Sequence, residues 1–399
     1  MAAHATLPGD SVQLSRLQQV SPDLGDDYMT LELLAVGLAG IQANQQKALW
    51  STAQPSGDPT GFPPAWKAGV TRLLWRALEA GCHELVSYAD AFRWCCMPLG
   101  KWPLALSVAP SDSELRLIEN GRPSAFTEQA ARLLLSKDPE AELIENRCYE
   151  LMIASADRNG ETEQAVQDNY VQLRGFLTTR AVASDIDLLG LLRAFPAKDA
   201  NGQPWVKRWF SQCYRAQPAS GAVTLSFCDG CENPVPGQRD CGTPGCMGAL
   251  TTRTVELMSE YFVQNRAVRR FFHDPGLAEQ RMFAALEPEF GQRLHPWWGM
   301  DAVDVAIDFD GTGKMGVGEW WAADVKDHAS ATLLGRSFRW NPRAASQRRV
   351  LVIAQHRFEQ PDYVDDLTTS LEGRAQGVEI MGEDAFVAAA LAHDGRRRR

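Results

Sequence analysis

The stretch from residue 301 to residue 326 constrains the fold most, because two arms of alternating apolar and charged residues flank a glycine-rich segment. The first arm is Val303–Ile307, and the second is Trp320–Lys326. Successive residues of a strand face opposite sides, so each arm can bury one row of side chains and present its charges on the other. Gly311–Gly318 contains four glycines, which suit a connecting turn. The sequence therefore predicts a β-hairpin that brings Asp304 close to Asp324.

Asp304, Asp324 and Lys326 are suited to phosphodiester hydrolysis. Carboxylates are the oxygen ligands that Mg²⁺ prefers, and this ion usually takes one or two of them while it keeps several waters. Such an ion polarises a phosphoryl oxygen, and a lysine beside it can hold water or stabilise charge that develops at phosphorus. Glu279, on a predicted helix at Gly276–Leu286, is a candidate third carboxylate. We expect Mg²⁺ or Mn²⁺ at Asp304 and Asp324; an ordinary surface ion pair of Lys326 is the alternative.

A second metal-site interpretation competes for the turn between the two arms. Asp308, Asp310, Thr312, Gly313 and Glu319 approximate the spacing of an EF-hand calcium loop. An EF-hand needs a helix on each side of its loop, whereas the flanking residues here alternate as strands do. Calcium binding is therefore the weaker expectation.

Four cysteines within nineteen positions predict a structural zinc site: Cys228, Cys231, Cys241 and Cys246. Four thiolates can bind zinc tetrahedrally, and Gly230 permits a tight turn between the first two. A disulfide and a redox CxxC motif are the alternatives. A disulfide is disfavoured in a cytosolic chain, and a redox motif would normally precede a helix rather than a proline-rich loop.

The chain has nine cysteines, so complete pairing within it is impossible. The longest apolar stretch, near Leu31–Ile41, is too short to span a bilayer, and the N-terminus does not resemble a signal peptide. These features predict a soluble cytoplasmic protein that does not engage a membrane.

The net charge of −10 does not indicate a general nucleic-acid binder, but the charge is unevenly distributed. His328–Phe358 contains no Asp or Glu. Its arginines follow directly on the acidic motif and could hold a phosphate backbone. The candidates for DNA contact are Arg336, Arg339, Arg343, Arg348 and Arg349. A solvated arginine-rich face is the alternative.

Asp304 together with Asp324-Val325-Lys326 resembles the active-site motif of PD-(D/E)xK restriction-endonuclease-like nucleases. The resemblance covers about residues 277–392, and the proline that usually precedes the first aspartate is replaced by Val303. Further phrases at Arg93–Leu106 and Tyr170–Arg180 make the whole chain similar to the endonuclease component associated with prokaryotic PIWI-RE proteins. The resemblance implies active-site roles for the residues named above, with Glu279 less directly matched.

The same resemblance implies partners. Members of that group occur in three-gene islands with a PIWI-like protein and a DinG-type helicase, and are thought to act against invading DNA. Many nucleases of this fold pair to cut both strands, so a homodimer is left open.

We therefore expect an α+β protein that is a metal-dependent DNA endonuclease. Its expected parts are a flexible segment at 1–26, a helical interaction or positioning domain at 27–215, a zinc module at 222–250, a restriction-endonuclease-like core with a mixed sheet at 251–395, and a basic tail at 396–399. The alternative is a non-catalytic adaptor that uses its zinc module and its arginines to dock nucleic acid or a partner protein.

Overall fold

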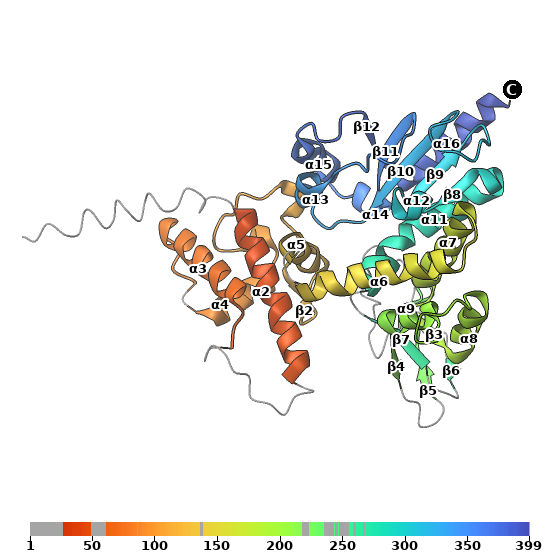
Figure 1. Ribbon diagram of the computed structural model, residues 1–399. Helices are drawn as coiled ribbons and strands as arrows, with labels where there is room; N and C mark the ends of the chain where they lie inside the picture. The colour runs from red at the N-terminus through yellow and green to blue at the C-terminus, as the bar shows by residue number, and fades with distance from the viewer. Residues whose placement is uncertain are drawn as a thin grey trace, which may run out of the picture. The chain divides into compact units, whose positions relative to one another are not determined.

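The computed structural model describes residues 27–48, 61–85, 87–135, 139–217, 223–234, 243, 246, 255–257, 261–265 and 268–398 (Figure 1). The flexible segment expected at 1–26 lies outside these residues. The contacts divide the chain into two compact units. One is Met1–Ser136 with Ala329–Leu333, and the other is Lys137–His328 with Leu334–Arg399.

The first unit is built mainly from helices packed around aromatic side chains. Its elements are α2 (Asp27–Ala48), α3 (Pro64–Glu79), α4 (Tyr88–Cys95), the short strands β1 (Ile118–Glu119) and β2 (Arg122–Pro123), and α5 (Ala125–Leu135). Trp66 and Trp94 are fully buried in its core. Helices α2 and α3 approach closely at Gly37, where an added Cβ would lie 2.5 Å from the Cα of Trp66. Ser330 joins this unit by donating a hydrogen bond to the Oδ2 of Asp112 (2.7 Å).

The second unit contains a five-stranded mixed sheet, as the hairpin and the downstream apolar runs predicted. Its strand order is β12 (Val378–Gly382), β11 (Arg348–Ile353), β10 (Trp320–Lys326), β9 (Val305–Asp308) and β8 (Leu294–Pro296). β9 pairs antiparallel with β10 and with β8, whereas β10, β11 and β12 are parallel. The expected hairpin is therefore present as β9 and β10.

The second unit contains helices before, between and after the strands of this sheet. The helices are α6 (Pro139–Arg158), α7 (Glu163–Thr179), α8 (Asp185–Ala194), α9 (Trp205–Cys213), α11 (Asp274–Phe290), α12 (Trp298–Asp301), α13 (Ala331–Ser337, of which only the last residues belong here), α14 (Gln355–Phe358), α15 (Tyr363–Leu371) and α16 (Glu383–Arg397). Two smaller sheets complete it, one of β3 (Val182–Ser184), β7 (Tyr261–Gln264) and β4 (Tyr214–Gln217), the other of β5 (Val223–Leu225) and β6 (Val255–Leu257).

The two faces of β10 carry different side chains, as the alternation in the sequence predicted. Trp321, Ala323 and Val325 lie in one large core with residues of α6, α7, α11 and α16. Trp320 and Ala322 pack on the opposite face in a smaller cluster. Because α6 and α7 share the large core with the sheet, residues 137–215 group with the C-terminal region. That grouping differs from the domain boundary expected after residue 215.

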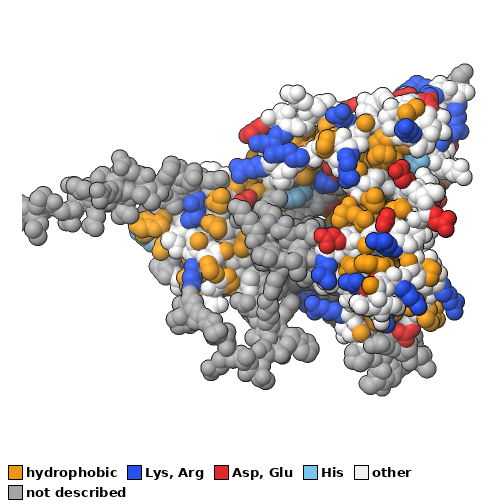
Figure 2. All heavy atoms as spheres, in the orientation of Figure 1, with side chains coloured by type: hydrophobic (Ala, Val, Ile, Leu, Met, Phe, Trp, Pro, Cys, Tyr) orange, Lys and Arg blue, Asp and Glu red, His pale blue; other side chains and the backbone are white. Residues whose placement is uncertain are grey.

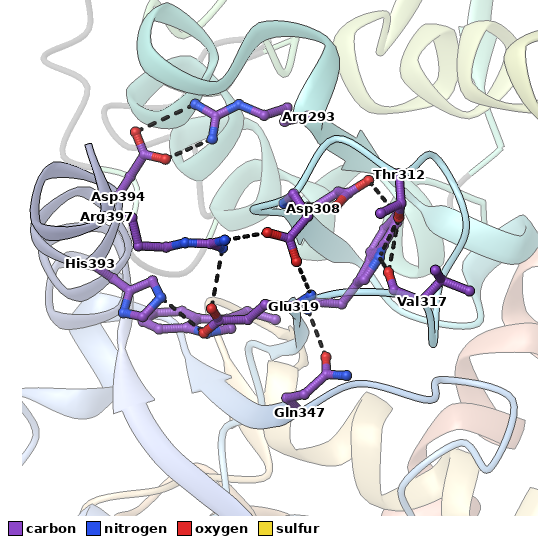
Figure 3. A network of polar contacts seen from close by, with 12 residues as sticks. Arg293, Asp308, Thr312, Val317, Glu319, Gln347, His393, Asp394 and Arg397 are labelled. Carbon is purple, nitrogen blue, oxygen red and sulfur yellow. Dashed lines mark hydrogen bonds and ion pairs between the residues drawn. The ribbon is translucent and has the colours of Figure 1, made fainter. Parts of the chain in front are cut away.

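The hairpin loop is organised by the carboxylate of Asp308, which is fully buried (Figure 3). It accepts hydrogen bonds from the backbone N–H of Asp310 (3.1 Å), from the backbone N–H of Gly313 (2.7 Å) and from the hydroxyl of Thr312 (3.1 Å). Gly318 has φ +76°, and a Cβ there would lie 2.6 Å from the Oδ2 of Asp310. The EF-hand interpretation is wrong, because strands β9 and β10 flank this loop instead of helices.

The C-terminal arginines also differ from the expected tail. Helix α16 includes Arg396 and Arg397, and Arg397 pairs with Asp310. It also pairs with Glu319 (Figure 3). Arg398 pairs with Glu289 at 2.6 Å. Acidic partners on the hairpin loop and on α11 thus hold Arg397 and Arg398. None of the helices among the described residues combines the length and the apolar character needed to cross a membrane.

Replacing the buried loop carboxylate tests this description of the hairpin. Asp308→Ala leaves two backbone donors without their acceptor, so the free energy of unfolding should fall by on the order of 2–3 kcal/mol. Thermal unfolding of the full chain measures the change. The control is Asp365→Ala, which removes an exposed carboxylate from α15 and should cost about 0.5 kcal/mol or less. Equal stability of the two variants would contradict the assigned role of Asp308.

Candidate active site

The antiparallel pairing of β9 with β10 brings two acidic residues to one edge of the sheet. Val305 is the register partner of Ala323, so the start of β9 lies beside the end of β10. The backbone N–H of Asp304 donates to the carbonyl of Ala323 (3.1 Å), and the Oδ2 of Asp304 accepts a hydrogen bond from the N–H of Val325 (2.7 Å). The carboxylate of Asp304 is thereby held against the last residues of β10, the strand that carries Asp324.

Lys326 lies between these two carboxylates. Its Nζ donates to the Oδ1 of Asp324 and lies 3.7 Å from the Oδ2 of Asp304. The side chains of Asp304 and Asp324 are 13% and 19% exposed, and that of Lys326 is 37% exposed, so solvent reaches the group from one side. The structure brings these three residues together, in a compact arrangement at the carboxyl end of β10.

Glu279 approaches the same group from α11 and is almost fully buried. Its Oε2 accepts hydrogen bonds from the indole N–H of Trp297 (2.5 Å) and from the Nη2 of Arg174 (3.4 Å). Trp297 links Glu279 to the pair of aspartates, because its backbone N–H donates to the carbonyl of Asp304 (2.8 Å). The structure therefore brings Asp304, Asp324 and Lys326 into contact and connects Glu279 to them through Trp297.

Two further charged residues of this site were missed in the sequence. Arg174, on α7, is buried between Glu279 and Asp301, and its Nε lies 3.4 Å from the Oδ2 of Asp301. A signal for Arg174 existed: it lies on the same helical face as the apolar Leu173 and Leu177. An arginine within an apolar stripe must find a buried partner. Asp301 gave no comparable signal.

The pKa values of the acids reflect their burial and mutual repulsion. Burial raises the pKa of Asp324 to about 7, with a further contribution from Asp304, although Lys326 opposes the shift. Burial likewise raises the pKa of Glu279 to about 7 against the effect of Arg174, and it raises the pKa of Asp301. Four carboxylates face only two cations here, so the ionised site carries a formal charge of −2.

This donor set fits one divalent cation. A charge of +2 would balance the excess negative charge of the ionised acids, which burial makes costly. Among the described residues, no three carboxylates bring their oxygens within 4.8 Å of one another. A site of two close carboxylates, Asp304 and Asp324, suits Mg²⁺, which keeps several waters in its shell.

The five arginines proposed for DNA contact fall into two groups. Arg336, Arg339 and Arg343 are exposed, and Figure 2 shows Lys and Arg side chains gathered over the region of α13 and α15. Arg348 instead forms two hydrogen bonds with Glu379 (2.8 and 2.7 Å) and stacks on the ring of Trp321.

Strand register explains the difference between the two arginines of β11. Arg348 is the register partner of Trp321, and Arg349 is the partner of Ala322. Arg349 therefore shares a face of the sheet with Asp324, whereas Arg348 lies on the opposite face. Of this adjacent pair, only Arg349 projects on the side of the candidate site.

Three cysteines of the expected zinc module lie close together. The sulfur atoms of Cys228, Cys231 and Cys246 all lie within 4.8 Å of one another, and the cluster could hold a metal ion. The sulfur atoms of Cys228 and Cys246 are 3.4 Å apart, and the two cysteines do not form a disulfide. Cys241, the fourth expected ligand, lies outside the described residues.

The backbone around Cys228 is shaped for a thiolate. Burial raises the pKa of its thiol, but the N–H groups of Cys231 and Gly230 donate to the sulfur and the resulting pKa is lowered. A thiolate is the form that binds zinc. The carbonyl of Cys231 contacts the Nε2 of His273 (2.8 Å), which precedes α11. The cysteine cluster thus packs at the start of the helix that carries Glu279.

Two family models match the chain. Residues 276–398 match a family described as "REase associating with pPIWI_RE", and residues 47–184 match "pPIWI_RE three-gene island domain Y". No curated protein and no solved structure matched the chain. The matches confirm the resemblance expected from the sequence: two stretches of the chain are similar to domains described for the pPIWI-RE three-gene island.

The raised pKa of Asp324 predicts a pH-dependent effect of neutralising it. In the metal-free folded protein, Asp324 keeps its proton up to about pH 7, whereas in the unfolded chain it loses it at about pH 4, so its contribution to stability falls between these pH values and is level above them. Asp324→Asn removes this dependence, so the Tm of the variant relative to the wild type should rise between about pH 5 and about pH 7 and level off above about pH 8.

Asp310→Asn is the matched control for this titration. The backbone N–H of Glu319 lowers the pKa of Asp310, which therefore stays ionised across the range, and the Tm difference of its variant should stay flat. A flat difference for Asp324→Asn as well would contradict the burial of its charge.

Replacing one thiolate tests the metal assignment of the cysteine cluster. Cys228→Ser should lower the zinc content of the purified chain from about one ion per chain, because a closed zinc site needs its sulfur ligands. Elemental analysis measures the content, and Cys96→Ser, which changes an exposed free cysteine, is the control. Equal zinc occupancy in both variants would refute the role of Cys228 as a ligand.

Proposed function

We propose that this chain is a DNA endonuclease that depends on Mg²⁺ or Mn²⁺ and serves as the nuclease of a pPIWI-RE three-gene system. The observation that carries the proposal is the arrangement of Asp304, Asp324 and Lys326 at the shared edge of β9 and β10. The match of residues 276–398 to a pPIWI-RE-associated REase supports it independently. On this proposal, the five-stranded sheet is a restriction-endonuclease-like core.

Asp304 and Asp324 would hold the divalent ion through their carboxylates, and Glu279 would complete the acidic set. When bound, such an ion supplies Lewis-acid polarisation of the phosphodiester. The ammonium of Lys326 would donate to the attacking water and stabilise the negative charge that develops on the phosphoryl oxygens. Water attacks phosphorus in line, the bond from phosphorus to the leaving oxygen breaks, and that oxygen takes up a proton.

The exposed arginines Arg336, Arg339 and Arg343, with Arg349, would hold the DNA backbone. Contacts of this kind position a duplex without selecting a sequence, and they weaken as the salt concentration rises. The net charge of −10 opposes unaided binding to DNA. We propose that the PIWI-like protein and the helicase of the island deliver the substrate, consistent with the match to domain Y.

Two substitutions test the site directly. Asp324→Ala and Lys326→Ala should each lower metal-dependent cleavage of plasmid DNA by about 10²-fold or more, because each removes a charge that acts in the transition state. The assay uses the full chain with Mg²⁺ or Mn²⁺, alone and with the two proposed partners. The controls Asp365→Ala and Lys314→Ala remove charges of the same two signs from exposed positions outside the site and should leave the rate unchanged.

Two outcomes would contradict the proposal. Cleavage that persists in both site variants would reject these residues as the active site. DNA or partner binding by a wild-type chain that never cleaves, with either metal and with both partners present, would instead support the non-catalytic adaptor.

A further inference from the structure

Arg174 occupies an unusual position for a helix residue far from the sheet in sequence. It is 4% exposed, and its guanidinium lies between the rings of Phe272 (5.1 Å) and Trp297 (5.2 Å). Its Nη1 donates to the hydroxyl of Thr178 and to the carbonyl of Phe272, both at 2.9 Å. A buried arginine with this many partners is held rigidly, and its planar fork fixes what it contacts.

The remaining donors of Arg174 face two acids of the candidate site. Its Nη2 donates to the Oε2 of Glu279, and its Nε lies beside the Oδ2 of Asp301. Trp297 donates to that same Oε2, so both contacts orient the carboxylate of Glu279 through one oxygen. Among the described residues, the Oε1 of Glu279 accepts no hydrogen bond. This arrangement directs one face of the carboxylate away from its anchors.

The turn from Trp297 to Asp301 has a backbone that other contacts must hold. Trp297, Met300 and Asp301 have φ of 45°, 57° and 62°, in the left-handed region that residues other than glycine rarely adopt. Strained backbone persists only when the surroundings determine it, and it gathers at functional sites.

Helices α6 and α7 supply the groups that hold this turn. The hydroxyl of Tyr149 donates to the carbonyl of Met300 (2.7 Å), and the amide of Gln167 donates to the carbonyl of Trp297 (3.0 Å) and accepts from the N–H of Met300 (3.2 Å). The hydroxyl of Tyr170 donates to the Oδ2 of Asp301 (2.5 Å).

The turn leads directly into the candidate catalytic strand. The N–H of Trp297 donates to the carbonyl of Asp304 (2.8 Å), so the conformation of the turn sets where Asp304 enters β9. A shift of the turn would move the carboxylate of Asp304 relative to Asp324. Misplacement of a reacting group by about 1 Å can lower the rate of a reaction by about 10²-fold.

We propose that Arg174 and Tyr170 are positioning residues of the nuclease centre, which fix Glu279, Asp301 and the turn before Asp304. The inference rests on the proposed function. Tyr170 and Arg174 fall within residues 47–184, and the acids fall within residues 276–398, so the proposed centre contains residues from both matched regions. The last helix of the domain Y match is thus part of the catalytic apparatus of the REase domain.

The test compares Arg174→Met, Arg174→Lys and Tyr170→Phe in the full chain. With Mn²⁺ and plasmid DNA, Arg174→Met should lower kcat about tenfold to a hundredfold while KM changes less than about twofold. Arg174→Lys should restore part of kcat, and Tyr170→Phe should show a smaller loss. Arg180→Met is the matched control, since it changes an exposed arginine at the end of the same helix.

Hydrogen exchange gives a readout that does not need cleavage. Peptides covering residues 294–308 should exchange about tenfold faster in Arg174→Met and in Tyr170→Phe than in the wild type, and at the wild-type rate in Arg180→Met. If the wild type never cleaves DNA but the variants still exchange faster than the wild type, the nuclease proposal is rejected and the positioning role is kept.

The positioning role itself has clear contrary results. Wild-type kcat and wild-type exchange in a folded Arg174→Met variant would overturn it while the nuclease proposal stands. If Arg174→Met does not fold, Arg174→Lys and Tyr170→Phe decide the question, and wild-type kcat and exchange in both would overturn the proposal.

Discussion

The pairing of β9 with β10 is the constraint on which the candidate site depends. Antiparallel strands place the start of one beside the end of the other, and the register of Val305 with Ala323 therefore puts Asp304 next to Asp324. Lys326 follows on the same face and lies between the two acids. A slip of one residue would send these side chains to opposite faces of the sheet.

Charge is the second constraint. Four carboxylates and two cations lie together in a partly buried site. Burial raises the pKa of Glu279, Asp301 and Asp324. Apolar packing alone would favour a neutral site, so the fold keeps this charge only because Arg174 and Lys326 lie among the acids. The same excess of negative charge is what makes a divalent cation a natural occupant.

Local pattern was enough to predict part of this structure. The alternation of apolar and charged residues predicted the hairpin and the sides of β10, and helical spacing predicted the segment that carries Glu279. The EF-hand alternative failed at the same level, because the arms beside the loop are strands. Arg348 and Arg349 show a limit of local pattern. As neighbours on a strand they must face opposite sides, but only the register with β10 tells which one shares a face with Asp324.

Long-range contacts explain what the sequence did not predict. Arg174 meets Glu279 more than a hundred residues further along the chain, and Tyr170 meets Asp301 at a similar separation. The spacing of Arg174 with Leu173 and Leu177 could have indicated that it is buried, but it could not have named the partner. For the same reason, the grouping of α6 and α7 with the sheet became visible only from their shared core.

The most direct test of the account is diffraction from crystals of the full chain soaked in Mn²⁺. Anomalous scattering should place one Mn²⁺ about 2.0–2.2 Å from a carboxylate oxygen of both Asp304 and Asp324, with the ammonium of Lys326 displaced to its side. An Mn²⁺ bound elsewhere, with Lys326 still joined to both carboxylates, would contradict the claim that these residues form a metal-dependent nuclease centre.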